Sequence, residues 1–422
     1  MEKQRNSSTE HSRSVPKLRF PVFIGEWEKK KLGEVAEFKV TNSFSRENLN
    51  YENGVVKNIH YGDIHTKFQT LFDITKEEVP FINEEMNVKR ILEDFYCKEG
   101  DIVFADASED LNDVGKSIEI IHLNNEKLLS GLHTLLARPK EKIFSLGFNG
   151  YLFKSNNVRL QIQKEAQGSK VLSINVGRIS NIYISFPTLP EQKRIASFFT
   201  VLDKKIAELK QKKTLLEQYK KGIMQKLFSQ ELRFKDENGK EFPNWVLEKL
   251  GEVAEIIMGQ SPESKSYNTE GNGKPLIQGN ADIQNRISNP RNWTTQTTKQ
   301  CQIGDLILTV RAPVGAVSKS IHNACIGRGV CAIRNTKITN IEFLYQYLLD
   351  YETKWSSIEQ GSTFTAVSGN EIKKLIINLP SFKEQTKIAN FLSAIDEKLN
   401  RTENQIQQTQ QYKKGLLQKM FV

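Results

Sequence analysis

The chain has 422 residues, 38% of them hydrophobic and 26% charged, which is ordinary for a soluble protein of roughly two to four domains. Its formal net charge of +10 favours a polyanionic partner, nucleic acid first, because basic side chains that neutralise phosphates release counterions; a basic protein without such a partner is the alternative. No apolar run could span a bilayer, the N-terminus has no signal-peptide core and the four cysteines contain no CxxC pair. These features exclude a membrane span, secretion, a zinc knuckle and a redox motif, and make the cytoplasm the expected compartment.

In chain order, the sequence predicts a polar, flexible N-terminal segment (1–20), a first globular domain (21–185), a long central helix (186–232), a second globular domain (233–380) and a long C-terminal helix (381–422). Short apolar runs predict strands at Asp101–Ala105, Leu132–Ala137, Leu306–Val310 and Ile372–Asn378, and a helix at Phe343–Leu349. This mixture indicates an α+β (mixed α/β) fold class.

The chain repeats itself. Residues 167–228 align without a gap onto residues 360–421 at an offset of 193 (360 − 167), with matching segments such as QYKKGxxQKxF. The segment from Trp27 to LGEVAE (32–37) returns as Trp245 to LGEVAE (250–255), now at an offset of 218 (250 − 32). The first copy is therefore longer by 25 residues (218 − 193), and the extra residues must lie before Gln167. Repetition on this scale indicates two copies of one structural unit.

Both long helices begin with a capping box, Thr188-Leu-Pro-Glu191 and Ser381-Phe-Lys-Glu384, in which the hydroxyl and the carboxylate are expected to satisfy free backbone amides. Apolar residues then recur at alternating steps of four and three, with breaks at Lys213 and Thr402. The seam residues are Ile195, Phe199, Leu202, Ile206, Leu209, Leu216, Ile223 and Leu227 in the first helix, and Ile388, Leu392, Ile395, Leu399, Ile406, Leu416 and Met420 in the second.

A helix with one apolar stripe is unstable alone in water, so we expect the two helices to pack on each other. A pseudo-two-fold axis between equivalent units requires an antiparallel coiled coil, which would place the globular domains at opposite ends of a rod. A parallel pair, with the domains side by side, is the alternative.

A search for catalytic residues finds none. Gly115-Lys116-Ser117 resembles the end of a phosphate-binding loop, but the required earlier glycine is Asp110. The histidines show no metal-ligand spacing, so no metal site is predicted. A self-sufficient DNA methyltransferase or nuclease would need a cofactor loop or a catalytic motif, and the sequence has neither. A coiled-coil scaffold that binds no DNA stays a second alternative.

Polar loops in both domains carry side chains suited to reading DNA, because arginine pairs with guanine and asparagine or glutamine with adenine. The candidates in the first domain are Lys57, His60, Tyr61, His65, Lys67, Lys89, Arg90 and Ser108. Those in the second domain are Ser261, Lys265, Tyr267, Gln278, Asn280, Gln284, Arg286, Arg291, Arg311 and Arg328. Arg328 lies between two glycines, which would let the backbone approach a phosphate.

The chain resembles the specificity (HsdS-type) subunits of Type I restriction–modification systems. The resemblance rests on VPKLRFPVFIGEWEKKKLGEV (15–35) and its return LRFKDENGKEFPNWVLEKLGEV (232–253), on the P-x-x-x-EQ-x-x-I helix starts, and on the QYKKGxxQKxF helix ends. The helix entries differ at one position, where the first copy has Pro190 and the second Lys383.

The resemblance implies that each globular segment is a target recognition domain for one half of a bipartite, asymmetric double-stranded DNA target. The coiled coil would set the spacer between the halves. Two methyltransferase (modification) subunits would dock on this frame and methylate adenine at N6, and endonuclease/translocase (restriction) subunits would cut unmodified DNA. S-adenosylmethionine, ATP and Mg²⁺ would belong to those partners, and this chain would bind no cofactor and catalyse nothing.

Overall fold

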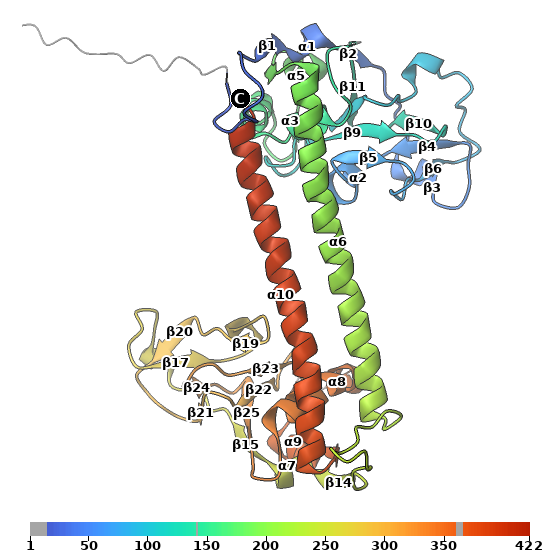
Figure 1. Ribbon diagram of the computed structural model, residues 1–422. Helices are drawn as coiled ribbons and strands as arrows, with labels where there is room; N and C mark the ends of the chain where they lie inside the picture. Colours follow the sequence, from blue (N-terminus) through green and yellow to red (C-terminus); the bar gives the residue numbers. More distant parts are fainter. Residues whose placement is uncertain (1–14, 141, 360–365) are drawn as a thin grey trace, which may run out of the picture. The chain divides into compact units, whose positions relative to one another are not determined.

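A computed structural model describes residues 15–140, 142–359 and 366–422 (Figure 1). The chain divides into two compact units, Met1–Leu209 with Gln405–Val422, and Lys210–Asn404. Each unit contains one globular domain and part of each long helix, α6 (Leu189–Phe228) and α10 (Phe382–Met420). The predicted α+β fold class is confirmed. None of the helices in the described ranges is long and apolar enough to cross a membrane.

The first globular domain is built on two main sheets. One has the strand order β2-β11-β7-β9-β5, with β2 Ala36–Lys39, β5 Leu71–Asp73, β7 Ile102–Ala105, β9 Ser117–His122 and β11 Thr134–Pro139. The other has the order β10-β4-β6-β3, with β3 Leu49–Asn50, β4 Val56–Ile59, β6 Phe81–Ile82 and β10 Lys127–Ser130. Two short pairs complete the strands: β1 (Glu28–Lys31) with β13 (Tyr183–Phe186), and β8 (Ala107–Ser108) with β12 (Leu172–Ser173).

The second globular domain repeats this topology. The order β15-β25-β22-β23-β19 matches the first sheet, with β15 Ala254–Met258, β19 Ile287–Ser288, β22 Leu306–Thr309, β23 Val317–Lys319 and β25 Val330–Asn335; β18 (Ile283–Gln284) adds an edge. The order β24-β17-β20-β16 matches the second, with β16 Tyr267–Asn268, β17 Lys274–Ile277, β20 Asn292–Thr294 and β24 Ala324–Ile326; β21 (Gln300–Cys301) adds an edge. A short pair, β14 (Val246–Lys249) with β26 (Ile376–Leu379), corresponds to β1 with β13.

The equivalent strands locate the extra residues of the first domain. The offset is 218 between β4 and β17 (274 − 56), 204 between β7 and β22 (306 − 102), 196 between β11 and β25 (330 − 134) and 193 between β13 and β26 (376 − 183). Of the 25 extra residues, 14 (218 − 204) thus lie between β4 and β7, 8 (204 − 196) between β7 and β11, and 3 (196 − 193) between β11 and β13. All of them are in the globular domain, so the additions leave the long helices unchanged.

Short helices connect the strands. In the first domain these are α1 Leu32–Val35, α2 Tyr61–Thr66, α3 Phe148–Leu152, α4 Asn156–Glu165 and α5 Val176–Ile179, with η1 Arg46–Asn48 and η2 Glu93–Phe95; in the second they are α7 Leu250–Val253, α8 Ile341–Glu359 and α9 Gly369–Lys374, with η3 Ser264–Ser266 and η4 Asn280–Asp282. The helix predicted at Phe343–Leu349 lies within α8. The strand predicted at Ile372–Asn378 is wrong in its first half: Ser368 caps α9 through its hydroxyl, and the strand begins only at Ile376.

The two long helices run antiparallel, as predicted. In the first unit Lys413 of α10 pairs with Asp203 of α6, while Phe421 packs on Phe199 with ring centroids 6.0 Å apart. In the second unit Lys220 of α6 pairs with Asp396 (2.6 Å) and Lys213 pairs with Glu403 (2.7 Å). Within each unit the residue numbers on one helix rise as those on the other fall. The structure places every predicted seam residue in a buried or half-buried position.

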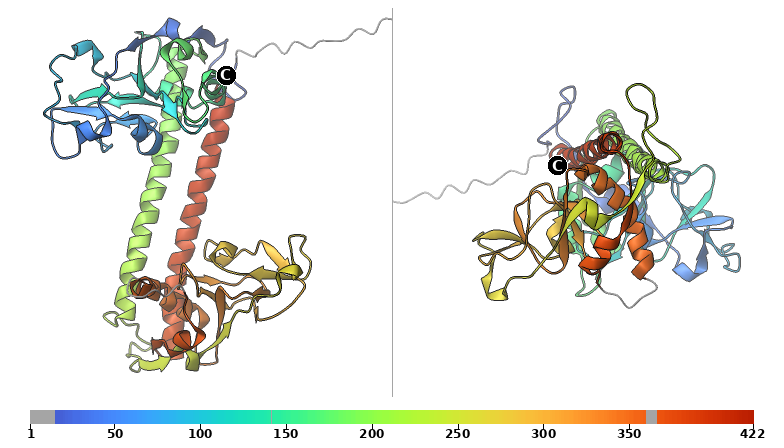
Figure 2. Two further views of the ribbon diagram at one scale, coloured as in Figure 1. Left: turned by 180° about the vertical axis from the view of Figure 1, so that it is seen from behind. Right: turned by 90° about the horizontal axis from the view of Figure 1, so that it is seen from below.

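Each globular domain is fixed to the long helices by apolar packing. In the first unit, α3 contributes Phe148 and Tyr151 to a core shared with Phe199 and Leu416. In the second unit, α8 contributes Phe343 to a core shared with Leu392, among others, and Figure 2 shows α8 and α9 beside the long helices. The aspartates of the ion pairs also bind these domains: Asp203 accepts the Tyr151 hydroxyl (2.9 Å).

The helix starts agree with the predicted capping boxes, but the carboxylates do not cap. Glu191 accepts two bonds from Arg19 (2.6 and 2.7 Å), and Glu384 accepts two from Arg233 (2.8 and 3.1 Å). Both carboxylates are almost fully buried, and a buried charge needs a charged, hydrogen-bonded partner. The acidic residue therefore anchors the entry segment of each unit and does not bond back to the first amide of its helix.

The glutamine that follows each of these acids has one role in both copies. Gln192 donates to the carbonyls of Pro187 (2.8 Å) and Ile143 (3.0 Å), and Gln385 donates to those of Pro380 (2.9 Å) and Ile338 (3.0 Å). The repeated Glu-Gln pair thus ties each long helix to its own domain.

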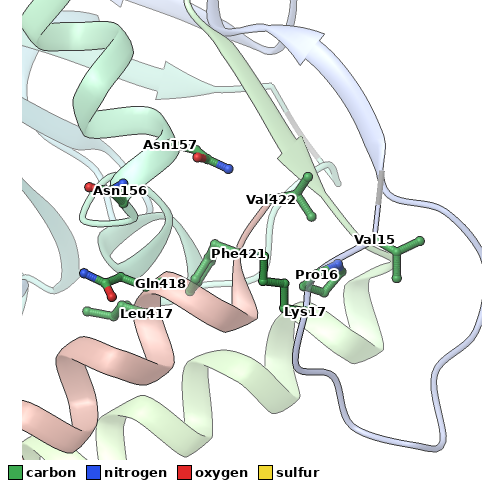
Figure 3. Close-up of a pocket in the computed structure, with 9 residues that line it drawn as sticks. All are labelled: Val15, Pro16, Lys17, Asn156, Asn157, Leu417, Gln418, Phe421 and Val422. Carbon is green, nitrogen blue, oxygen red and sulfur yellow. The ribbon is translucent and has the colours of Figure 1, made fainter. Parts of the chain in front are cut away.

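Residues 15–20 are not a free tail, so the predicted boundary at residue 20 is wrong. Leu18 donates its amide to the Lys419 carbonyl (2.9 Å), and the Phe20 ring lies 5.7 Å from that of Phe198. Figure 3 shows Val15, Pro16 and Lys17 lining one cavity with Phe421 and Val422. The rest of the segment predicted to be flexible, residues 1–14, lies outside the described residues.

We expect Asp396→Ala to lower the free energy of unfolding by about 2 kcal/mol, because the change removes a charged acceptor from Lys220 and from the Gln346 amide (2.7 Å). The neighbouring Glu397→Ala is the control: its pair with Arg401 is exposed, and its loss should cost less than about 0.5 kcal/mol. Urea unfolding of both variants measures the difference, and equal effects would show that the Asp396 contacts do not stabilise the unit.

Candidate nucleic-acid interface

In each globular domain, three chain segments meet at the same place in the fold. In the first domain Asn42 donates its amide to Ser130 O (3.0 Å), and Gly131 donates to Ile59 O (3.0 Å). These bonds join the segment after β2, the end of β4 and the turn between β10 and β11. We call residues 42–46, 60–67 and 131–133 the first junction.

The second domain has the same backbone bonds at the equivalent positions. Gln260 donates to Ile326 O (2.9 Å), and Gly327 donates to Ile277 O (2.8 Å). We call residues 260–267, 278–282 and 327–329 the second junction. The two junctions share a backbone frame and differ in nearly every side chain.

The second junction presents amide, hydroxyl and guanidinium groups. The Gln278 side chain donates to the Tyr267 hydroxyl (3.1 Å), which donates in turn to Pro262 O (3.1 Å). Ser261 accepts the backbone amide of Arg328 (3.1 Å), whose side chain is exposed. These groups form a small polar surface held by bonds to the backbone.

Asp282 organises the other side of this junction. Its carboxylate accepts the amide of Gln278 (2.8 Å) and the Arg291 Nε (3.1 Å), while its side chain is only 3% exposed. Asn280, two residues before it on η4, is exposed. The carboxylate is therefore already occupied and leaves the exposed polar groups around it free to meet a ligand.

Two glycines make the second junction compact. A Cβ on Gly329 would overlap the carbonyl oxygen of Gln278, and a Cβ on Gly259 would overlap that of Gly327. Backbone atoms cannot move aside as a flexible side chain can. The turn that carries Arg328 is therefore held tightly between β15 and β17.

The first junction presents aromatic and imidazole rings instead. The Tyr61 ring lies 4.7 Å from His60, 6.1 Å from His65 and 5.3 Å from His133, centroid to centroid. His133 has a positive φ of 55° and occupies the position equivalent to Gly329 (329 − 133 = 196). Four rings thus form one cluster at this site.

An ion pair between the half-exposed Arg46 and the buried Asp63 supports this cluster. Arg46 donates twice to Asp63 (2.9 Å each), whose side chain is 1% exposed. The amide of Gly62 donates to His60 Nδ1 (3.1 Å), which assigns the proton of the neutral ring to Nε2. Burial, with Arg46 nearby, lowers the pKa of His60, so this ring stays neutral at physiological pH.

The structure gathers some of the predicted residues of the first domain and separates others. His60, Tyr61, His65 and Lys67 lie in the first junction, and Ser108 is next to it because His65 Nε2 donates to Ala107 O (3.0 Å). Lys57 is instead bound to Glu126 (2.6 Å). Lys89 and Arg90 lie on the loop between β6 and β7, outside the junction as defined.

In the second domain the structure places Ser261, Lys265, Tyr267, Gln278, Asn280 and Arg328 in the second junction, with Arg291 bound to it through Asp282. Arg311 is close by, because the amide of Val310 donates to Gly329 O (2.9 Å). Arg286 is instead held by Glu352 of α8, and Gln284 accepts from Asn289 (3.0 Å). These two residues are outside the second junction as defined, although Arg286 lines one cavity with Asn280.

Sequence reasoning did not select Arg46, Tyr51 or His133 for this site. Tyr51 accepts from Arg46 Nη1 (3.1 Å), and the Lys67 ammonium lies 5.0 Å from its ring centroid. His133 could have been found only after the strands were matched. Its equivalence to Gly329 holds at an offset of 196, whereas the repeated sequence segments align at offsets of 193 and 218. For Arg46 the sequence carries no signal.

No group of three or more metal-ligating side chains is present in the described ranges.

The family model for the Type I restriction modification DNA specificity domain matches the chain twice, at residues 24–218 and 243–409. The chain belongs to this family. Each match covers most of one globular domain and most of the long helix that follows it, so the duplication seen in the fold is a duplication of the family's domain.

The chain is similar to known specificity subunits over most of their length. The chain is 34% identical to a Methanocaldococcus jannaschii protein with the provisional name type I restriction enzyme MjaX specificity subunit, over 75% of this chain and 76% of that protein. It is 27% identical to the EcoKI specificity subunit of Escherichia coli K12, over 68% of this chain and 66% of that protein. The chain therefore has the DNA-specificity role of a Type I restriction–modification system and not a catalytic one.

A solved structure has the same fold. It comes from a study of complex assembly and conformational transition of the type I R-M system, and it matches with a TM-score of 0.60 at 23% identity, over 93% of this chain and 96% of that one. At this identity the likeness establishes the two-domain, coiled-coil fold alone.

We expect Gly329→Ala to lower the free energy of unfolding by about 1–3 kcal/mol, because the added methyl meets the Gln278 carbonyl. Gly279→Ala is the control: its Cβ would have no neighbour within 4 Å, and its φ of 178° is extended. Thermal unfolding compares the two. An unchanged melting temperature for Gly329→Ala would show that the turn is not held tightly against β17.

Proposed function

We propose that the first and second junctions each read one half of a bipartite, asymmetric double-stranded DNA target. The observation that carries this proposal is the pairing of one backbone frame with two unrelated sets of side chains. Identical frames present their side chains in the same way, and different side chains select different bases. The net charge of +10 over the whole chain favours binding to the phosphate backbone.

The long helices would set the spacer between the half-sites. Support comes from α6, which is continuous over 40 residues from the first unit into the second, and from α10, which is continuous over 39. Half-sites on one face of B-DNA recur at about one helical turn, near 34 Å, so a fixed separation of the two readers selects a fixed spacer.

Two methyltransferase (modification) subunits would dock on the repeated segment Tyr-Lys-Lys-Gly, residues 219–222 on α6 and 412–415 on α10. Tyr219 is 50% exposed and Tyr412 58% exposed. A Cβ on Gly222 or Gly415 would have no neighbour within 4 Å. An open glycine inside a helix costs about 1 kcal/mol relative to alanine. Its presence in both copies beside an exposed tyrosine supports a surface that two identical partners approach closely.

The remaining partners follow from the family. Restriction subunits (endonuclease/translocase) would join the same assembly, and S-adenosylmethionine, ATP and Mg²⁺ would be bound by the partners. The cytoplasm is the proposed compartment, and the four cysteines, all free and buried, support it.

Long-read methylome sequencing of cells that express the chain with its modification subunit tests the reading and spacing together. The native chain should direct adenine methylation to one bipartite sequence. Insertion of one heptad into both long helices, at equivalent places, adds about 10.5 Å to each. We expect both half-sites to be unchanged and the spacer between them to lengthen. An unchanged spacer would rule out the helices as the ruler.

We expect Gly222→Leu with Gly415→Leu to stabilise the chain by about 0.5–1 kcal/mol per site, because leucine is the better helix former. The same change should weaken assembly with the modification subunit, since the added side chains fill the open space. Thr214→Leu is the control, an exposed change two turns away on α6. Sedimentation measures assembly, and urea unfolding measures stability. Full assembly of the double variant would show that the modification subunits dock on another surface.

A further inference from the structure

The described part of the chain holds its arginines in contacts with carboxylates, carbonyls or rings, with three exceptions. Arg90, Arg311 and Arg328 are exposed, and no described residue binds their guanidinium groups. The neighbours of Arg328 show the contrast: Arg291 is bound to Asp282, and Arg334 to Asp305 (2.8 and 2.9 Å). Two of the three unpaired arginines, Arg311 and Arg328, are at the second junction.

The backbone around Arg328 is fixed on three sides although its side chain is free. The Arg328 amide donates to Ser261 Oγ (3.1 Å), the amide before it donates to Ile277 O (2.8 Å), and the carbonyl after it accepts from Val310 N (2.9 Å). Gly259 and Gly329 lie so close to neighbouring backbone that an added Cβ would overlap a carbonyl oxygen, so the turn is closely packed against these segments. A rigid turn presents the side chain at a lower entropic cost on binding than a mobile loop would.

The chemistry of this position is that of a planar, charged donor. A guanidinium can donate two parallel bonds to O6 and N7 of guanine in the major groove, or to two oxygens of a phosphate. Asp282, the buried acid of this junction, binds the Gln278 amide and Arg291 and makes no bond to Arg328. Arg328 is therefore free to bind either a guanine or a phosphate.

Comparison with the first junction favours a base over a phosphate as the ligand of Arg328. The equivalent turn of that junction keeps the same backbone bond, Gly131 to Ile59, but has Leu132 where the second has Arg328 (328 − 132 = 196). Every DNA half-site offers phosphates, so a phosphate contact would be expected in both copies of the frame. A guanidinium present in one copy only fits a contact that depends on sequence.

We propose that Arg328 is a specificity-determining residue that reads a guanine in the half-site bound by the second domain. The proposal rests on the proposed function of the second junction and names one base that it selects. Gln278, beside Arg328 and restrained by Tyr267, would contact a neighbouring base pair.

The test uses the full chain assembled with its modification subunit and maps methylation with Arg328→Ala and Arg328→Lys. Both variants should lose about ten- to a hundredfold of methylation at the native target, because lysine keeps the charge but not the paired donors. Sequences with any base at one former guanine position of the second half-site should become methylated, while the first half-site stays unchanged.

A phosphate contact predicts a different pattern. Arg328→Lys would then resemble the native chain, and Arg328→Ala would weaken binding to all sequences alike, with the salt slope reduced by about one. Either result overturns the proposal. Arg401→Ala is the control, because it removes an exposed arginine of α10 outside both junctions and should leave both half-sites unchanged.

Failure of this inference can be told apart from failure of the proposed function. If the native chain directs no bipartite methylation, the proposed function fails. If it does, and Arg328→Ala keeps the native second half-site, only the role of Arg328 fails. Because no described residue touches the Arg328 guanidinium, we expect the melting temperature of the variants to equal that of the native chain, and this measurement excludes misfolding as a cause.

Discussion

The structure depends on one constraint: each long helix has a single apolar stripe and is unstable in water until that stripe is covered. The partner that covers it is the other long helix. Charged residues then fix the register, since Asp203 with Lys413 and Lys220 with Asp396 are the same pair repeated at an offset of 193 (396 − 203). Each aspartate also accepts a bond from its globular domain, so one carboxylate joins the helix pair to the domain in each unit.

The entry segments show the same principle at the start of each helix. Glu191 and Glu384 are buried, and a buried carboxylate is tolerable only with a charged, hydrogen-bonded partner. Arg19 and Arg233 supply it from the segments that precede β1 and β14. The duplicated motifs are therefore concentrated at the positions that the long helices need for their packing. The sequence of the globular loops has no such restriction.

That freedom explains how two equivalent junctions came to differ. The bonds that build them, such as Gly131 to Ile59 and Gly327 to Ile277, join backbone atoms, which every residue except proline can supply. The side chains on the frame can therefore change without loss of the fold. One junction has become a cluster of tyrosine and histidine rings, and the other a surface of amide and guanidinium groups. Two halves of a DNA target read by such sites would be read by different chemistry.

The sequence by itself determined the frame: the repeat, the starts of both long helices and their apolar seam follow from patterns along the chain. The repeat also predicted the antiparallel pairing, which the contacts between the helices confirmed over the parallel alternative. The sequence also selected residues that the fold brings together within each domain, such as Tyr61 and His65 in the first and Gln278 and Ser261 in the second. The tertiary structure alone decided which of the candidates are free. Lys57 and Arg286 read as open charges in the sequence, but Glu126 and Glu352 bind them from distant segments. It also decided that Ile372 is helical and that His133 joins the first junction. Contacts between residues far apart in the chain decide such questions, and no local pattern records them.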